Sequence, residues 1–211
     1  MIPIESLVTF VFASALLSIA PGPDNIFVLT QSALYGRRSG LLITLGLCTG
    51  LIVHTSLVAF GIAAIFQASS VAFTTLKIIG ALYLLYLAWL AFTAGTSDLE
   101  SASSTQRSAI ALYQRGILMN LSNPKVSIFF LAFLPQFVSL ENGALAPQIL
   151  ILGFLFIVVA LIIFGTIAML AGTLGAWLRK SSRTQVYLNR LAGTVFVALA
   201  LNLLVAQNSM Q

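Results

Sequence analysis

Residues 21–25 read Pro-Gly-Pro-Asp-Asn, and they stand inside an apolar stretch that runs from Ile4 to Leu34. About 20 apolar residues suffice to cross the hydrocarbon core of a bilayer, so this stretch is long enough to span a membrane. Proline interrupts a helix because it lacks the backbone N–H and clashes with the preceding turn. The stretch therefore predicts a membrane-spanning helix that is broken near its middle, with the carboxylate of Asp24 at the break.

A second apolar stretch, Ile110–Phe137, carries a similar interruption. Its residues 123–125 read Asn-Pro-Lys, so that a lysine follows the proline where the first stretch has an aspartate. A charged side chain at the centre of a bilayer costs at least about 2.5–3.5 kcal/mol on insertion scales. Asp24 and Lys125 are therefore each expected to have a polar or charged partner, or a role in function.

The rest of the chain fits a membrane protein. Of its 211 residues 59% are hydrophobic and only 7% are charged, whereas an ordinary soluble domain carries about 25% charged residues. This composition excludes a soluble globular protein and a disordered chain. The net charge of +5 comes from basic residues in twos and threes rather than in a stripe, so we expect no nucleic-acid partner. One cysteine and one histidine exclude a disulfide within the chain and a structural zinc site, and we expect no metal and no cofactor.

Six apolar stretches are candidate membrane spans. They are Ile4–Leu34, Leu41–Phe66, Val71–Ala94, Ile110–Phe137, Pro147–Leu178 and Val186–Ala206. Eight of the ten Lys and Arg residues then fall in or beside the first, third and fifth loops. The positive-inside rule places these loops in the cytoplasm and both termini outside.

A linker at about residues 95–108 divides the single transmembrane domain, residues 1–211, into two halves of three spans. The halves cover about residues 1–94 and about residues 109–206, and each begins with a broken span. An odd number of spans per half gives the halves opposite orientations. We therefore predict an all-α integral membrane fold of six helices, built as two inverted-topology repeats with broken first helices, which is typical of transporters.

Asp24 and Lys125 are predicted to lie at similar depths. At the rise of a helix, Asp24 is about 20 Å and Lys125 about 15 Å from the cytoplasmic edge. We hypothesise that Asp24 binds a substrate ammonium or carries a coupling proton, and that Lys125 binds a substrate carboxylate or is the counter-ion of Asp24. The structural alternatives are that Asp24 only caps the half-helix beginning at Asn25, and that Lys125 extends to an interface.

His54 lies with Gly46, Gly50 and Gly61 on one predicted helix face, because their spacings of 4, 4 and 7 repeat with the helix. The Gly46–Gly50 pair predicts close helix packing. The simpler interpretation of His54 is a hydrogen bond to a neighbouring backbone carbonyl, and the alternative is a proton relay. Asn120 precedes the second break by one turn and ranks above Asn202 as a binding residue, whereas Lys77 is expected to be an interfacial anchor and Cys48 a packing residue.

No catalytic residue is predicted. The candidate substrate- and ion-binding residues are Pro21, Gly22, Pro23, Asp24, Asn25, Asn120, Asn123, Pro124 and Lys125.

These motifs resemble the lysine-exporter (LysE/RhtB) family, most closely its homoserine/threonine-resistance branch. The resemblance rests on residues 21–25, 36–41 and 46–54, and on Leu-Ser-Asn-Pro-Lys at 121–125 followed by Phe-Phe-Leu-Ala-Phe-Leu-Pro-Gln-Phe at 129–137. It covers essentially the whole chain. It implies a multi-pass protein of the bacterial inner membrane that exports amino acids or small derivatives, driven by the proton-motive force, with the transport site at the two breaks.

Other functions stay open on the sequence alone. The main alternative is a passive channel or uniporter for small zwitterionic metabolites, and another is a scaffold subunit held by glycine packing. An intramembrane enzyme is disfavoured, because one His, one Cys and one buried Asp on separate segments give little from which to build an active site. The expected partners are a small amino acid, protons and the lipid bilayer, and a homo-oligomer stays open.

Overall fold

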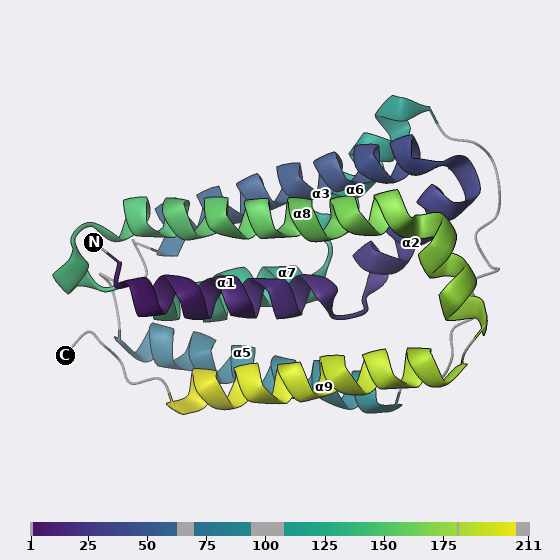
Figure 1. The fold of residues 1–211 in the computed structure, drawn as a ribbon. Coiled ribbons are helices and arrows are strands. Elements are labelled where there is room, and N and C mark those ends of the chain that lie inside the picture. Colours follow the sequence, from purple (N-terminus) through teal and green to yellow (C-terminus); the bar gives the residue numbers. More distant parts are fainter. Residues whose placement is uncertain (1, 63–69, 94–107, 181, 206–211) are drawn as a thin grey trace.

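The computed structural model describes residues 2–62, 70–93, 108–180 and 182–205, and every regular element in these ranges is helical (Figure 1). The α-helices are α1 (Ile4–Ile19), α2 (Pro23–Tyr35), α3 (Arg37–Leu57), α5 (Ser70–Thr93), α6 (Ala109–Leu121), α7 (Pro124–Ile128), α8 (Leu145–Lys180) and α9 (Ser182–Val205). Short π-helical turns are η1 (Val58–Ile62) and η2 (Phe129–Phe133), and short 3-10 turns are η3 (Leu134–Phe137) and η4 (Leu140–Asn142). The all-α prediction is confirmed for the described residues.

Both proline interruptions bend the chain as predicted. The axes of α1 and α2 differ by 58°, and those of α6 and the segment Pro124–Phe137 differ by 51°. Each bent pair is long and apolar enough to cross a membrane, and so are the single stretches Arg37–Gly61 and Leu145–Ala171. Ile78–Thr93 and Asn189–Val205 are also apolar but shorter than these stretches. The chain is thus an all-helical, multi-pass membrane protein.

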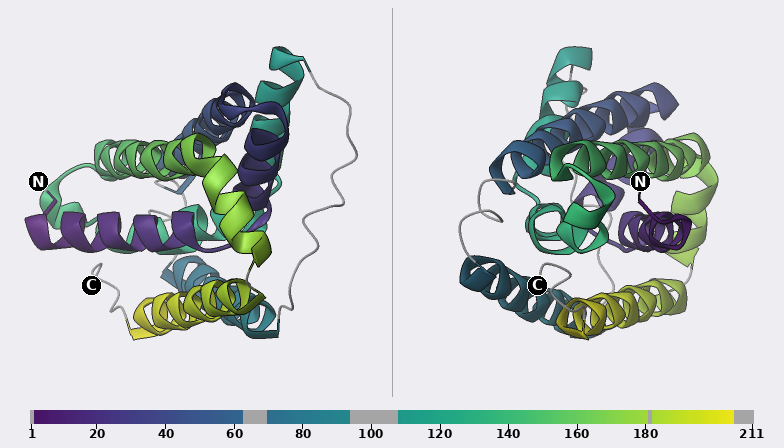
Figure 2. Two further views of the ribbon diagram at one scale, coloured as in Figure 1. Left: turned by 45° about the vertical axis from the view of Figure 1, so that its right-hand side comes forward. Right: turned by 90° about the vertical axis from the view of Figure 1, so that its left-hand side faces the viewer.

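The helices form three layers (Figures 1 and 2). Helices α3 and α8 make one outer layer, and α5 and α9 make the other. Helix α1 and the segment Pro124–Phe137 lie side by side between them, where Phe10 of α1 packs against Phe129 of η2 at 5.9 Å and Phe137 of η3 at 5.2 Å between ring centroids. Helix α1 begins and α9 ends at the same end of the molecule. This arrangement brings both breaks into the interior.

Glycines allow α3 and α6 to pack closely, as the Gly46–Gly50 pair predicted. A Cβ atom on Gly46 would collide with the backbone of Tyr113 and Gly116, and one on Gly50 would lie 2.6 Å from Asn120 Oδ1. The predicted extension of this face to Gly61 is wrong, since Gly61 is exposed and a Cβ atom added to it would meet no atom within 4 Å. The reason is η1, whose wider turn rotates the following residues away from the face that α3 presents.

Two predicted boundaries are also corrected. The second span begins at Arg37 rather than Leu41, because Gly36, with a φ of 85°, turns the chain directly from α2 into α3. Only a glycine adopts this backbone conformation readily. Beyond the second break the predicted half-helix is irregular, because α7 ends at Ile128 and gives way to η2 and η3. Pro135, which cannot donate a backbone hydrogen bond, lies at the start of η3, after the regular α-helix has already ended.

Candidate functional site

The first break leaves the carboxyl end of α1 to be satisfied by side chains. The last carbonyl groups of any helix lack partners within that helix. Here Lys125 Nζ donates to the carbonyl oxygens of Leu17 at 3.2 Å and Ala20 at 3.1 Å. Asn25 Nδ2 donates to the carbonyl oxygen of Ser18 at 2.7 Å. An ammonium group thus lies at the negative end of the α1 dipole, where a positive charge is favoured.

The second break is organised by Asn123, which is the N-cap of α7. Its side-chain Oδ1 accepts the backbone N–H of Lys125 at 3.0 Å, and its Nδ2 donates to Asp24 Oδ2 at 2.9 Å. One amide therefore caps its own half-helix and also holds the carboxylate of the other break. The contact joins residues that are 99 positions apart in the chain.

Each charged residue thus contacts the opposite break, and both are buried, with 2% of Asp24 and 6% of Lys125 exposed. The capping alternative for Asp24 is wrong, because α2 begins at Pro23 and the Asp24 side chain makes no capping hydrogen bond. The interfacial alternative for Lys125 is wrong because its ammonium is buried on α1. No salt bridge within 4 Å joins Lys125 to Asp24, because the α1 carbonyl groups hold the ammonium. The two buried charges still attract each other through space, so the counter-ion interpretation of Lys125 stays open.

A cavity of about 10 Å³ lies where the two breaks meet. A space of this size holds about one water molecule. Within the part of the chain that the structure describes, three atoms at this cavity have no hydrogen-bond partner: Ser18 Oγ, Asp24 Oδ1 and Asn120 Oδ1. Leu51, Val126, Phe156 and Phe164 supply apolar walls. The site therefore combines an acid, a base and unpaired oxygen atoms, and must widen to admit anything as large as an amino acid.

The prolines and Gly22 shape the site without supplying polar side chains. Pro23 and Pro124 are the first residues of α2 and α7 and both are exposed. Gly22 lies against the base, because a Cβ atom there would be 3.1 Å from Lys125 Nζ.

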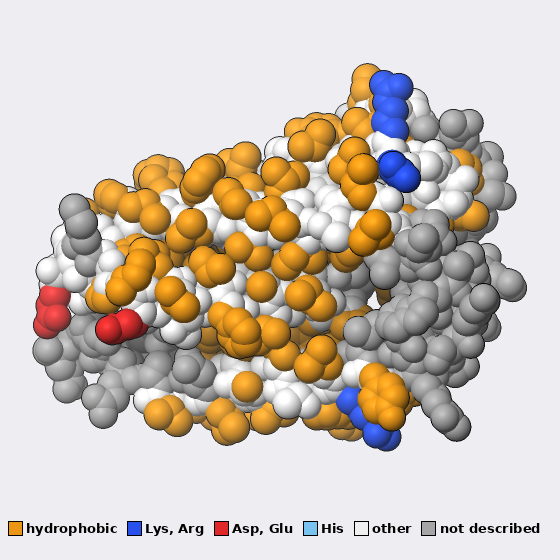
Figure 3. Space-filling model, in the orientation of Figure 1, with side chains coloured by type: hydrophobic (Ala, Val, Ile, Leu, Met, Phe, Trp, Pro, Cys, Tyr) orange, Lys and Arg blue, Asp and Glu red, His pale blue; other side chains and the backbone are white. Residues whose placement is uncertain are grey.

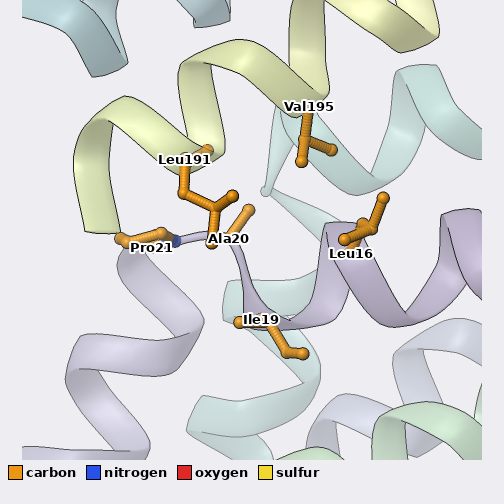
Figure 4. A pocket seen from close by; sticks show the side chains of 7 residues that line it. Leu16, Ile19, Ala20, Pro21, Leu191 and Val195 are labelled. Atoms are coloured by element: carbon orange, nitrogen blue, oxygen red, sulfur yellow. The ribbon is translucent and has the colours of Figure 1, made fainter. Parts of the chain in front are cut away.

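Pro21 faces away from the site. It lines a separate small cavity, also of about 10 Å³, at which Leu16 and Ala20 face Leu191 and Val195 of α9 (Figure 4). Because all side chains that line this cavity are apolar, the site between the breaks is the better candidate for a zwitterionic substrate.

His54 lies behind the site rather than in it. Its Nε2 is 3.4 Å from the carbonyl oxygen of Asn120, and its ring packs on Phe130 with centroids 5.6 Å apart. The same carbonyl accepts the backbone N–H of Asn123 at 3.1 Å. This geometry fits the simpler interpretation of His54, in which the imidazole supports the turn before the second break.

Some predictions fall elsewhere. Cys48 is buried, as expected of a packing residue, whereas the side chains of Lys77 and Asn202 and the predicted linker lie outside the described residues. Ser18 was missed by the sequence reasoning, as were the α1 carbonyl groups. The Ser14–Ser18 pair, four residues apart on one face of an apolar helix, was the signal that could have identified Ser18.

A wider hollow lies at the end of the molecule where α2 turns into α3. It has a volume of about 340 Å³ and lies between Ser32, Gly36 and Arg37 on one side and residues 168–171 of α8 on the other.

Near the paired breaks, the structure brings together five of the predicted residues: Gly22, Asp24, Asn120, Asn123 and Lys125. No group of three or more His, Cys, Asp or Glu residues that could hold a metal ion occurs in the described ranges.

Comparison with known proteins gives consistent matches. The family model described as "LysE type translocator" matches residues 15–207. The chain is 38% identical over 189 residues to a homoserine/homoserine lactone efflux protein of Salmonella typhi, covering 89% of this chain and 90% of the relative. It is 32% identical to an uncharacterized membrane protein of Vibrio cholerae, covering 94% and 96% of the two chains. It is 24% identical to a leucine efflux protein of Klebsiella pneumoniae, covering 95% of each. No solved structure matches the chain.

Proposed function

The chain belongs to the family of LysE type translocators, and from this membership and the geometry of the two breaks we propose that it exports small amino acids from the cytoplasm. The family model describes translocators and the named relatives are efflux proteins, so the chain is a transporter and not an enzyme. The scaffold alternative has no observation in its favour.

The observation that carries the proposal is that each break holds the charged residue of the other. Asn123 of the second break binds Asp24, and the α1 carbonyl groups at the first break bind Lys125. An amino-acid zwitterion needs a site with an acceptor for its ammonium group and a donor for its carboxylate. Asp24 Oδ1 is a buried carboxylate oxygen without a partner among the described residues. Lys125 Nζ is held by carbonyl oxygens that a substrate carboxylate can replace. Interrupted helices near the middle of a membrane are the usual place for such sites in transporters.

Two of the three substrates in the names of the relatives, homoserine and leucine, are zwitterions, whereas homoserine lactone keeps the ammonium group but has no free carboxylate. One relative is named for the efflux of homoserine and its lactone and another for that of leucine. Homoserine and leucine share the α-ammonium and α-carboxylate groups and carry no charge on their side chains. One buried acid and one buried base suit such substrates, and we extend this class to the present chain.

The fold that we propose has six membrane spans in two inverted repeats. The first repeat is α1–α2, α3 and α5, and the second is α6–α7 with its irregular continuation, α8 and α9. The packing supports this equivalence, because α3 packs along α6 as α8 packs along α1 and α2, and α5 packs along α9. Both repeats also begin with a helix broken at a proline.

The distribution of charge supports an orientation with both termini in the periplasm of a bacterial inner membrane. Lys and Arg side chains show at one end of the molecule and Asp and Glu side chains at the other (Figure 3). Arg37 and Arg38 begin α3 at the turn from α2, whereas Glu5 lies in the first turn of α1 and Glu141 in η4, which precedes α8. The positive-inside rule makes the arginine end cytoplasmic. The hollow of about 340 Å³ lies at this end of the molecule.

We further propose that export is coupled to proton entry and that Asp24 carries the proton. The burial of Asp24 supports this role. Asp24 lies inside the helix bundle, whereas the other carboxylates that the structure describes, those of Glu5 and Glu141, are exposed. A group that binds the substrate ammonium in one step and a proton in the next would link the two fluxes.

Flux into inside-out membrane vesicles tests the proposal. Vesicles that contain the chain are given radiolabelled homoserine, threonine, leucine, lysine and glutamate, with and without a protonophore. We expect uptake of the neutral amino acids that collapses with the proton gradient. Uptake that persists down the solute gradient would indicate the passive channel, and no uptake of any amino acid would contradict amino-acid export.

A further inference from the structure

Ser18 breaks a rule that the other buried hydroxyl residues in the described helices follow. Ser14, Ser32, Ser39, Thr44 and Thr55 are buried, and each donates its hydroxyl to the carbonyl oxygen four residues earlier, at distances of 2.6–3.2 Å. In an apolar environment this bond is the usual way in which a helical hydroxyl is satisfied. Ser18 is 3% exposed, and its Oγ has no hydrogen-bond partner among the described residues.

The unpaired hydroxyl lies at the site that the breaks form. Ser18 lines the cavity that Asp24 and Lys125 also line, and it stands in the last turn of α1, whose carbonyl groups hold the Lys125 ammonium. A buried hydroxyl without a partner is unfavourable unless a ligand or water supplies the hydrogen bond. Its position therefore points to a contact with whatever occupies the cavity.

We propose that Ser18 is a specificity-determining residue that hydrogen-bonds a polar group on the side chain of the transported amino acid, such as a hydroxyl. The assignment rests on the proposed function. There Asp24 takes the ammonium and Lys125 takes the carboxylate, which leaves Ser18 Oγ and Asn120 Oδ1 as the unpaired atoms for the remaining part of the substrate. Of these two atoms only the Ser18 hydroxyl can both donate and accept a hydrogen bond, as a substrate hydroxyl requires. The other walls, from Leu51, Val126, Phe156 and Phe164, are apolar. The site would thus select a short side chain with a polar tip over an apolar side chain of the same size.

A matched pair of substrates tests this assignment. Homoserine and norvaline have side chains of equal length and differ in that homoserine ends in a hydroxyl and norvaline in a methyl group. Their fluxes are measured in inside-out vesicles for the wild type, for Ser18→Ala and for Ser14→Ala. Ser14 is the control, because it lies one turn earlier on α1, is equally buried, and donates its hydroxyl to the Phe10 carbonyl oxygen.

We expect the wild type and Ser14→Ala to favour homoserine over norvaline by about tenfold, the effect of one hydrogen bond. In Ser18→Ala this preference should disappear through a loss of homoserine flux, whereas norvaline flux should stay at the wild-type level and show that the variant is folded. An unchanged preference in Ser18→Ala would overturn the assignment. Equal losses of both fluxes would also overturn it, because Ser18 would then act on the ammonium or on the helix. If the wild type carries neither substrate, this assignment fails, whereas the proposal of amino-acid export fails only if the wider panel of amino acids also shows no uptake.

Discussion

The two breaks are alike in construction and opposite in charge. Each half-helix that follows a break begins with a proline, Pro23 or Pro124, and has a charged residue next, Asp24 or Lys125. The carboxylate agrees with the positive end of its own helix, whereas the ammonium opposes it. Lys125 is therefore placed unfavourably for α7 and favourably for the carboxyl end of α1, which it contacts. The charge at the second break therefore stabilises the first break rather than its own half-helix.

The breaks also differ in how they are capped. Asn123 caps α7 with its own side chain, but Gly22, the N-cap residue of α2, has none. The space beside Gly22 is taken by the Lys125 ammonium. The first break thus depends on residues of the second, and removing them should disturb α1 more than α7.

Replacement of Lys125 by methionine should have the largest effect. The Lys125→Met variant loses two charge-assisted hydrogen bonds to α1 and the proposed partner of the substrate carboxylate. We expect export to fall by about 100-fold or more, since each such bond contributes about 1.5–3 kcal/mol. Homoserine flux in vesicles measures this, with the amount of inserted protein as normalisation. Flux at the wild-type level would show that the contact of Lys125 with the first break has no functional role.

Replacement of Asp24 by asparagine separates charge from structure at the first break. The side chain of the Asp24→Asn variant would keep an oxygen to accept the Asn123 amide, so the contact between the breaks should survive. Loss of the charge should still reduce export by roughly 10- to 100-fold, the range of one hydrogen bond to an ionised group. Thermal unfolding of the purified variant in detergent should be close to that of the wild type. Normal export in this variant would contradict the role given to Asp24.

A methyl group at Gly22 should weaken the first break without removing any charge. In Gly22→Ala the new Cβ would lie 3.1 Å from Lys125 Nζ, so the ammonium has to move by a few tenths of an ångström. We expect export to fall by about tenfold, because a displaced ammonium loses about one hydrogen bond to α1. Gly61→Ala is the matched control, since its Cβ meets no atom within 4 Å and export should not change. Equal export in both variants would mean that Gly22 does not position Lys125.

The smallest effect is expected at His54, which supports the second break from α3. In His54→Gln the amide can still donate to the Asn120 carbonyl oxygen that the imidazole reaches. Export should fall by about threefold at most, within the strength of a neutral hydrogen bond, and should stay sensitive to a protonophore. A loss of proton-coupled flux in this variant, with uncoupled flux retained, would establish the relay interpretation instead.

The sequence alone predicted where the apolar helical segments lie and where two of them are broken. Composition and stretch length locate the apolar segments, and proline marks both interruptions because its effect on a helix is local. The same reasoning identified Asp24 and Lys125 as the charged residues at the two breaks, since a charge inside an apolar stretch is easily recognised. It also anticipated close helix packing at Gly46 and Gly50, because small residues four apart form a flat helix face, but it did not identify α6 as the partner.

The partners of these residues could not be read from the sequence. Lys125 binds backbone carbonyl groups of Leu17 and Ala20, which have no sequence signature. Asn123 reaches Asp24 across 99 positions of the chain, a contact that only the packing of the layers defines. The unpaired hydroxyl of Ser18 is likewise a property of the fold, because most helical serines bond to their own helix. The π-helical turn that moves Gly61 off its predicted face has no local residue that marks it.

Ligand-induced thermal stabilisation of the purified protein tests most directly the claim that the two breaks bind the two ends of one zwitterion. The ligands are homoserine, homoserine amide, which lacks the carboxylate, and N-acetylhomoserine, which lacks the ammonium. A ligand that binds the folded protein raises its Tm by mass action. We predict that homoserine raises the Tm of the wild type, that neither analogue does so at the same concentration, and that homoserine has no effect on Asp24→Asn or Lys125→Met. An equal rise with either analogue would contradict the account, because one of the two charges would then not be recognised.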